Sequence, residues 1–195
     1  AQHYTVITHD QRGTGRSEKL PEGAPIATLA ADAIGLMDVL GIGKAHLLCH
    51  STGCGMGQSI ASSHASRVGR LVLAAPWAYA DEYLTGIQEL RKAAAVALSP
   101  EHYARFNALL LFPPEFWRAD VAGFARAAAQ ANLHPHDAAA IAARLDAILA
   151  FDARALWPAI KCPTLVMVSR DDLVMPRWFG VDAARSIAGA RLIEF

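Results

Sequence analysis

The chain has 195 residues, and its 18 basic and 18 acidic side chains give a formal net charge of zero. A length of this order suits one domain, and the balanced charge excludes a basic surface of the kind that binds nucleic acid or anionic membranes. The longest apolar runs, residues 71–80 and 93–98, are too short to cross a bilayer. We therefore expect a small-molecule partner, with neither nucleic acid nor membrane.

The cysteines indicate the redox state of the protein's compartment, and the first loop indicates whether the protein binds a dinucleotide cofactor. Cys49, Cys54 and Cys162 have no spacing typical of a disulfide framework or a metal site, which favours a reducing compartment. Cytoplasmic location is the default expectation, although the chain begins without a methionine. Gly13 and Gly15 follow a predicted strand at residues 4–9, as in a dinucleotide-binding fingerprint. The third glycine is absent and prolines follow, so we expect no cofactor.

A serine at residue 51 stands between two regular segments. Residues 45–49 form a short apolar run that predicts a strand buried on both faces, and a glycine-rich helical segment follows the serine. A serine on such a turn exposes its hydroxyl, and the first N–H groups of the helix face a developing oxyanion. Gly53 supplies a small residue where the backbone passes close to itself, whereas Cys49 stands where glycine is commoner. The alternative is that Ser51 only caps a helix.

Strands and helices alternate around this serine. A helix with its N-cap at Thr28 is predicted before it and ends at Gly41, and residues 71–75 read as a strand ended by Pro76. This alternation predicts an α/β protein with a doubly wound, mostly parallel sheet and helices on both faces. Sites in such sheets lie at the carboxyl ends of the strands, where Ser51 is placed.

The middle of the chain is predicted to be all-helical. Helical segments at residues 84–98, 101–110, 121–132 and 137–150 are separated by prolines, with no strand pattern between them. We read residues 77–155 as a helical cap inserted between two parts of the core, residues 1–76 and 156–195. The candidates to line a pocket under this cap are Phe112, Phe116, Trp117 and Phe124; the alternative is that they form the cap's own core. His134 and His136 are too isolated to predict a metal site.

The last part of the chain supplies a candidate acid. Residues 163–168 predict a further strand that runs into Asp171 and Asp172, and residues 190–195 predict the last strand. A carboxylate at this strand end is suitably placed to orient a catalytic histidine. The alternative is an acidic turn capping the helix that begins near Pro176, which we prefer for Asp171.

Taken together, these segments resemble an α/β-hydrolase over essentially the whole chain. The motifs that carry the resemblance are Asp10-x-Arg12-Gly13-x-Gly15-x-Ser17, Cys49-His50-Ser51-Thr52-Gly53, the helical insertion, Cys162-Pro163-Thr164-Leu165 and Asp171-Asp172-x-x-x-Pro176. Within that superfamily, residues 10–15, 111–117 and 151–176 are most similar to the aminoacrylate hydrolases of pyrimidine utilisation and to the 3-oxoadipate enol-lactonases.

The resemblance implies a role for individual residues. Ser51 is implied as the nucleophile, the backbone N–H of Thr52 as one half of the oxyanion hole, and Asp172 as the acid, with no cofactor. The implied reaction is hydrolysis of a small carboxylic ester, lactone or amide through an acyl-enzyme. The same residues would also suit a carbamate-like or carbon–carbon bond, and a non-catalytic small-molecule binding protein of the same fold is the alternative from another class.

One member of the implied triad is missing. In the chain order Ser, Asp, His, the histidine would follow Phe195, and the second oxyanion donor would precede Ala1. None of the eight histidines is a convincing substitute, since the ring of His50 is expected to point away from Ser51. We therefore expect an internal fragment of a hydrolase that is inactive alone and folds poorly because sheet edges are left open.

Overall fold

The structure is a computed structural model that describes residues 3–18 and 23–195. The strands are β1 (Ala45–His50), β2 (Val68–Ala74), β3 (Thr164–Val168) and β4 (Arg191–Glu194). The helices are α1 (Ile26–Val39), α2 (Thr52–Ser63), α3 (Glu82–Ala97), α4 (Pro100–Leu111), α5 (Pro114–Ala119), α6 (Val121–Gln130), α7 (Ala138–Leu149) and α8 (Arg177–Ser186), with short 3-10 turns η1 (Ala65–Arg67) and η2 (Trp157–Ala159).

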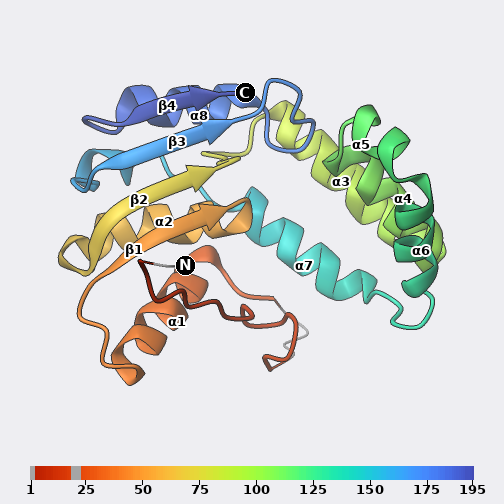
Figure 1. The fold of residues 1–195 in the computed structure, drawn as a ribbon, viewed down its shortest axis with the longest axis horizontal. Helices are drawn as coiled ribbons and strands as arrows, with labels where there is room; N and C mark the ends of the chain where they lie inside the picture. Colours follow the sequence, from red (N-terminus) through yellow and green to blue (C-terminus); the bar gives the residue numbers. More distant parts are fainter. Residues whose placement is uncertain (1–2, 19–22) are drawn as a thin grey trace.

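The four strands form one parallel sheet in the order β1-β2-β3-β4 (Figure 1). Cys49, Leu73 and Val166 are register neighbours on these strands and are buried. Helices α2 and α8 cover this face so closely that Gly57 and Gly180 have no room for a side chain against it. The predicted parallel α/β fold is confirmed.

Residues 4–9 do not form the strand that their apolar character predicted. The Tyr4 and Val6 side chains are 68% and 66% exposed, and the segment joins no strand of the described sheet. A strand exists only through hydrogen bonds to a neighbouring strand, and residues 3–18 and 23–195 supply none beside this segment. Its contact with the sheet is an edge-on packing of Tyr4 against His46 of β1, with ring centroids 6.0 Å apart.

The expectation that β1 is buried on both faces is wrong for this structure. Cys49 is buried against α2, whereas Leu48, one residue earlier, is 80% exposed. Successive side chains of a strand point to opposite faces, so Leu48 lies on the face away from α2. Nothing in the described part of the chain covers Leu48 there.

Helix α1 starts two residues before the predicted cap at Thr28. Its N-cap position is Pro25, whose φ of −56° already suits the first turn, and Gly41, with a φ of 68°, follows its end as predicted. The helix turns one apolar stripe inward, formed by Ile26, Leu29, Ala30, Ile34 and Met37.

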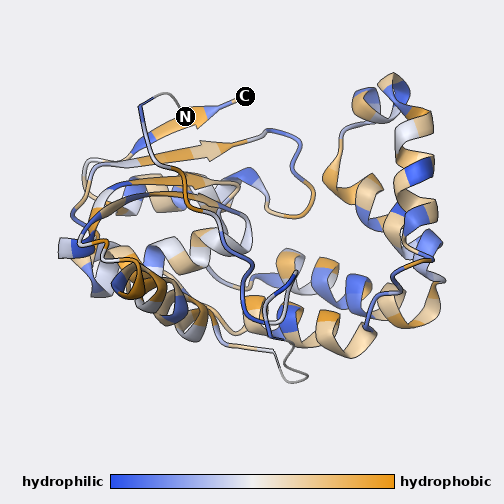
Figure 2. Ribbon diagram, turned by 60° about the horizontal axis from the view of Figure 1, so that its bottom comes forward, coloured by the Kyte–Doolittle hydropathy of each residue, from blue (hydrophilic) through white to orange (hydrophobic). Residues whose placement is uncertain are grey.

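Between β2 and β3 every regular element is helical (Figure 1). The sequence explains most helix starts, since the side chains of Asp81, Ser99, Asp120 and Asp137 each accept a hydrogen bond from the first turn of the helix that follows. The short helix α5 was not predicted; its start at Pro114 uses a proline where the first turn needs no N–H donor. The insertion's helices alternate hydrophobic and hydrophilic residues along their length (Figure 2). The described helices include none long and apolar enough to cross a membrane.

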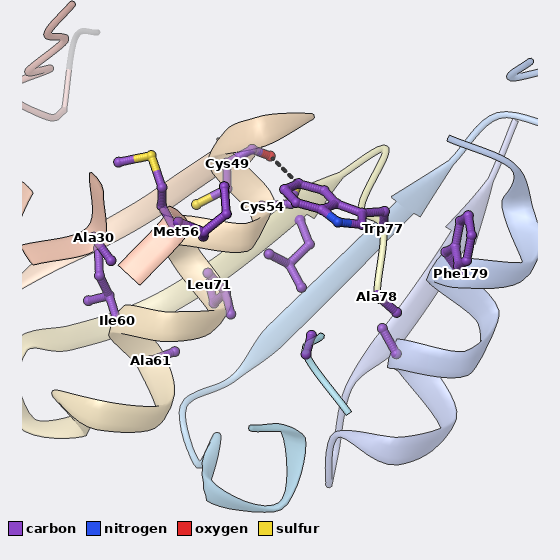
Figure 3. Close-up of a cluster of buried hydrophobic side chains, with 14 of the residues drawn as sticks. Ala30, Cys49, Cys54, Met56, Ile60, Ala61, Leu71, Trp77, Ala78 and Phe179 are labelled. Atoms are coloured by element: carbon purple, nitrogen blue, oxygen red, sulfur yellow. Dashed lines mark hydrogen bonds between the residues drawn. The ribbon is translucent and has the colours of Figure 1, made fainter. Parts of the chain in front are cut away.

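The two ends of the insertion are bonded to each other and to α2. The Ala153 N–H donates to the carbonyl of Ala78 at 2.6 Å. Gln58 of α2 is fully buried, donates to the carbonyl of Trp77 at 3.2 Å and accepts from the indole N–H of Trp157 at 2.7 Å. Trp77 and Ala78 lie in the buried cluster between α2 and α8 (Figure 3). The insertion therefore leaves and rejoins the core through one hydrogen-bonded junction.

Candidate active site

Ser51 lies on an abrupt turn between β1 and α2. Its φ of 50° and ψ of −122° fall outside the regions that L-residues prefer, and the strain is held by hydrogen bonds from Ser51 N to Ala74 O (3.1 Å) and from Cys54 N to Ser51 O (2.7 Å). The Ser51 hydroxyl accepts no hydrogen bond from the first turn of α2. The helix-capping alternative is therefore not what the side chain does, and the hydroxyl remains available.

The glycines of α2 differ in how much space surrounds them. A Cβ on Gly53 would meet only Cys49 Cβ at 4.0 Å, an ordinary contact, so the predicted close backbone approach is not at this residue. A Cβ on Gly57 would overlap Cys49 Sγ and lie 3.1 Å from Leu71 Cδ1. The helix is thus close to the sheet one turn further along, where glycine makes room for the cysteine.

The two cysteines beside the serine are not competing nucleophiles. Burial raises the pKa of the Cys49 thiol to about 12 and raises that of Cys54 further. Cys54 also donates its S–H toward the carbonyls of Cys49 and Ala74, at 3.4 and 3.2 Å. Both thiols remain protonated at neutral pH and pack in the buried hydrophobic cluster (Figure 3).

Asp172 follows β3, the strand two places from β1. Its Oδ1 accepts hydrogen bonds from Val174 N (2.9 Å) and Met175 N (2.8 Å), while Oδ2 has no bonded partner among the described residues. Helix α8 has its N-cap at Pro176, so Asp172 stabilises its own turn and not the helix. Asp172 is half-buried and Asp171 is exposed. Two strand spacings, about 10 Å, separate β1 from β3, which leaves room for one side chain between Ser51 and Asp172.

The turn that carries Asp172 is attached to the insertion. The Tyr83 hydroxyl of α3 donates to the carbonyl of Leu173 at 2.9 Å, and the Trp178 indole N–H donates to Asp81 Oδ2 at 3.0 Å. The rings of Tyr83 and Trp178 pack edge to face with centroids 5.5 Å apart. These contacts fix the position of the Asp172 turn relative to α3, the first helix of the insertion.

A small cavity of about 30 Å³ adjoins the serine turn. Thr52, the residue after the serine, forms one wall, and the loop at residues 11–14 forms another. Arg12 in this loop makes two hydrogen bonds to Asp32 of α1, at 2.7 and 2.6 Å. The opposite wall belongs to α7 and consists of Ala140, Arg144 and Ala147. Sequence reasoning missed Arg144, because nothing in the local pattern of α7 distinguishes it from a solvated arginine.

The four aromatic candidates pack on one another. Trp117 stacks on Phe124 with centroids 4.3 Å apart, and Phe112 contacts Phe124 at 5.1 Å and Phe116 at 6.5 Å. The Trp117 indole N–H donates to the carbonyl of Ala108 at 3.3 Å. None of the four lines the cavity beside Thr52. They form a cluster on the insertion in which Phe112 and Phe116 are 43% and 61% exposed, so these two are not part of a buried core there.

No described histidine hydrogen bonds to Ser51 or Asp172. His50 is exposed, and because neighbouring strand residues alternate it points to the opposite face from Cys49. His136 hydrogen bonds to the carbonyl of Ala95 at 2.7 Å inside the insertion. Residues 3–18 and 23–195 also contain no cluster of three His, Cys, Asp or Glu side chains that could hold a metal ion.

A parallel sheet, a strained serine at a strand-to-helix turn, an acid two strands along and a helical insertion between them define the α/β-hydrolase class of fold. The family model described as the alpha/beta hydrolase family matches residues 1–195, and the chain belongs to that family. By this membership the chain is of the hydrolase type.

Curated relatives and solved structures agree with this assignment. A protein of Azorhizobium caulinodans named "Putative carbamate hydrolase RutD" is 32% identical over 194 residues, which is all of this chain and 73% of that protein. A protein of the same name from Caulobacter vibrioides is 32% identical over 178 residues, 90% of this chain and 65% of its own length. A hydrolase from Pseudomonas aeruginosa has a TM-score of 0.86 at 31% identity, covering 100% of this chain and 72% of its own. The enol-lactonase from Burkholderia xenovorans has a TM-score of 0.83 at 30% identity, covering 95% and 70%.

Proposed function

We propose that the protein is a serine hydrolase that cleaves a small carboxylic ester, lactone or amide-type substrate through an acyl-enzyme on Ser51. The observation that carries the proposal is the Ser51 turn itself. Ser51 is a non-glycine residue at positive φ, and its hydroxyl makes no capping hydrogen bond. The fold therefore holds Ser51 in a strained backbone conformation that serine rarely adopts. Such strain is typical of a nucleophile presented at the edge of a sheet.

In the proposed mechanism, Ser51 Oγ passes its proton to the base and attacks the substrate carbonyl to form a tetrahedral intermediate. Collapse of that intermediate breaks the bond to the alcohol or amine group, which takes the proton from the base, and leaves the acyl-enzyme on Ser51. The backbone N–H of Thr52, at the positive end of the α2 dipole, stabilises the oxyanion. Water then attacks the acyl-enzyme, and the acid product leaves. Asp172 would accept a hydrogen bond from the base through Oδ2, since Oδ1 is already engaged by two backbone N–H groups.

The base in this proposal is a histidine outside these 195 residues. No described histidine hydrogen bonds to Ser51 or Asp172, and the relatives named above are longer than the segment that matches this chain. The complete reading frame provides the direct check: a histidine following the β4 segment supports the proposal, and a frame without one contradicts it.

We take the substrate class from two similar proteins whose names specify a reaction. One is named "Putative carbamate hydrolase RutD" and another is named an enol-lactonase. A carbamate or an enol-lactone is therefore the substrate class to test first, with simple esters as the general probe.

The proposal predicts the effect of removing each catalytic group from the protein encoded by the complete reading frame. Ser51→Ala should lower kcat for 4-nitrophenyl acetate by about four to six orders of magnitude, because the acyl-enzyme cannot form. Asp172→Asn should lower kcat by roughly 10⁴-fold through loss of the correct imidazole orientation. Steady-state kinetics and mass spectrometry after treatment with a fluorophosphonate, which should add to Ser51, provide the two measurements.

Asp171→Asn is the matched control, because Asp171 is the exposed neighbour of Asp172. It should leave kcat within about threefold. A fully active Ser51→Ala variant would instead favour the non-catalytic binding protein, and a labelled but esterase-inactive wild type would favour the carbon–carbon bond alternative.

A further inference from the structure

A buried glutamine on α2 joins both ends of the helical insertion to the helix that follows the serine. Gln58 is fully buried, and both polar atoms of its amide are hydrogen bonded. Its Nε2 donates to the carbonyls of Cys54 and Trp77, at 3.1 and 3.2 Å. Its Oε1 accepts from the indole N–H of Trp157 at 2.7 Å. Trp77 stands where the chain leaves the core and Trp157 where it has returned, so one side chain holds both ends of the insertion.

Trp77 extends this contact from α2 to α7. Its indole N–H donates to the carbonyl of Ile148, near the end of α7, at 3.2 Å, and its side chain is fully buried. A Cβ on Gly55 of α2 would lie 2.7 Å from Trp77 Cη2, so the ring packs directly on α2. Trp77 therefore contacts α2 through its ring and its carbonyl, while its indole nitrogen bonds to α7.

The position of α7 matters because this helix forms a wall of the cavity beside the serine turn. Arg144 and Ala147 of α7 line the same cavity as Thr52. Ile148 follows Ala147 directly, so the hydrogen bond to the Ile148 carbonyl acts beside that wall. In Figure 1, α7 runs from the outer helices of the insertion to the sheet. The bonded path from Gln58 to α7 thus ends at a wall of the cavity.

The same network reaches the serine turn from its other side. The Cys54 carbonyl accepts from Gln58, and the Cys54 N–H donates to the Ser51 carbonyl at 2.7 Å. Apolar packing is non-directional, whereas a hydrogen bond requires a particular distance and angle. A buried amide with its polar groups bonded therefore specifies one arrangement of the groups around it.

We propose that Gln58 is a positioning residue that sets the position of α7 relative to the serine turn, and thereby acts on substrate binding and not on the chemical step. It acts through Trp77 and Trp157 and touches no reacting atom. The inference rests on the proposed function in one respect, that the protein hydrolyses an ester. The position of α7 relative to α2 does not depend on that function and can be tested separately.

Spin-label distances test the position of α7 without requiring turnover. Ser63→Cys at the exposed end of α2 and Ala139→Cys on an exposed position of α7 provide the labelling sites, in a Cys162→Ser background of the protein from its complete reading frame. Double electron–electron resonance should give one narrow distance distribution for the intact network. Gln58→Met fills a similar space without an amide, so it should broaden that distribution or shift its mean. An unchanged distribution would overturn the proposal.

Two further variants separate positioning from loss of stability. Trp157→Phe keeps an aromatic ring and removes the indole donor to Gln58, so it should alter the distribution as well, and it serves as the test if Gln58→Met does not fold. Ile34→Ala, in the buried stripe of α1, should lower the melting temperature and leave the distribution as in the wild type. An equal change in Ile34→Ala would show that the distribution reports stability alone and would overturn the proposal.

Two esters provide the activity measurement. In Trp157→Phe, kcat for 4-nitrophenyl acetate should stay within about threefold, because Ser51 and Asp172 are unchanged. KM for 4-nitrophenyl butyrate should rise about tenfold, because its longer acyl group is more sensitive to a displaced cavity wall. Equal losses of kcat for both esters, with KM unchanged, would overturn the positioning role.

The two kinds of measurement separate this inference from the proposed function. A wild type that hydrolyses neither ester contradicts the proposed function alone, since the spin-label distances still test Gln58. An active esterase whose distances and KM values do not change in Gln58→Met or Trp157→Phe contradicts the positioning role alone.

Discussion

At the scale of single residues, the packing of α2 against β1 beside the serine turn depends on two residues, Cys49 and Gly57. Cys49 occupies a position where a smaller residue is usual for such turns, and its sulfur fills the space beside α2. Gly57 leaves that space open by having no side chain. Gly53, which the sequence pattern singled out, has room for a methyl group. The packing requirement is therefore at residue 57.

We predict opposite effects for alanine at these two glycines. Gly57→Ala should destabilise the protein by about 1–3 kcal/mol, because the new methyl group overlaps Cys49 Sγ. Cys49→Gly in the same protein should recover a large part of that loss, as a double-mutant cycle of urea denaturation would measure. Gly53→Ala should be neutral or stabilising by up to about 1 kcal/mol, since alanine is the better helix former. Equal losses at both glycines would contradict this account.

At the scale of elements, the loop at residues 11–14, which forms a wall of the cavity, is attached to α1. The attachment is the two-pronged hydrogen bond from Arg12 to Asp32. The hydrogen bond from Arg12 lowers the pKa of Asp32 below its ordinary value of 3.8. Protonation of Asp32 at low pH should therefore weaken the attachment of the loop to α1.

The direction of the pH effect follows from this shift. A carboxylate whose pKa is lower in the folded state contributes stability that is fully present above its unfolded pKa and is lost as the pH falls through its folded pKa. The difference in melting temperature between the wild type and Asp32→Asn should be constant from pH 7 to about pH 5, should shrink as the pH falls past 3.8, and should disappear below the folded-state pKa. The difference itself should be small, since the pair is partly exposed. A difference that grows on acidification would contradict the assignment.

At the scale of the whole molecule, the described sheet has one covered face and one partly open face. Leu48 is 80% exposed on the face away from α2, and Ile193 of β4 is 41% exposed. β1 is also an edge of the described sheet, since residues 4–9 do not pair with it. An apolar edge strand with unpaired backbone groups is a template for association.

We predict that the 195-residue chain expressed alone associates through this edge. Size-exclusion chromatography should show aggregates or oligomers, and thermal unfolding should lack a single cooperative transition. Leu48→Lys should increase the soluble fraction, because it places a charge on the exposed strand. A soluble, cooperatively melting monomer of the unmodified chain would show that the open face is tolerated.

The sequence was sufficient where the determining signal is local. The short apolar run, the serine turn and the glycine-rich segment predicted β1, Ser51 and α2, because hydrophobic pattern and turn residues act over a few residues. The order of strands and helices predicted the parallel sheet through the rules of crossover connections. It also placed Asp172 at the end of β3, where the structure has it.

Contacts between distant segments could be decided only by the tertiary structure. Residues 4–9 carry the apolar pattern of a strand but pair with no strand of the described residues, because pairing depends on a neighbour as well as on the segment's own residues. The aromatic candidates pack together within the insertion, and Arg144 lines the cavity in their place. Interactions between residues close in the sequence thus determined which segments form helices and strands. The side chains that line the site were determined by which helices the fold brings into contact.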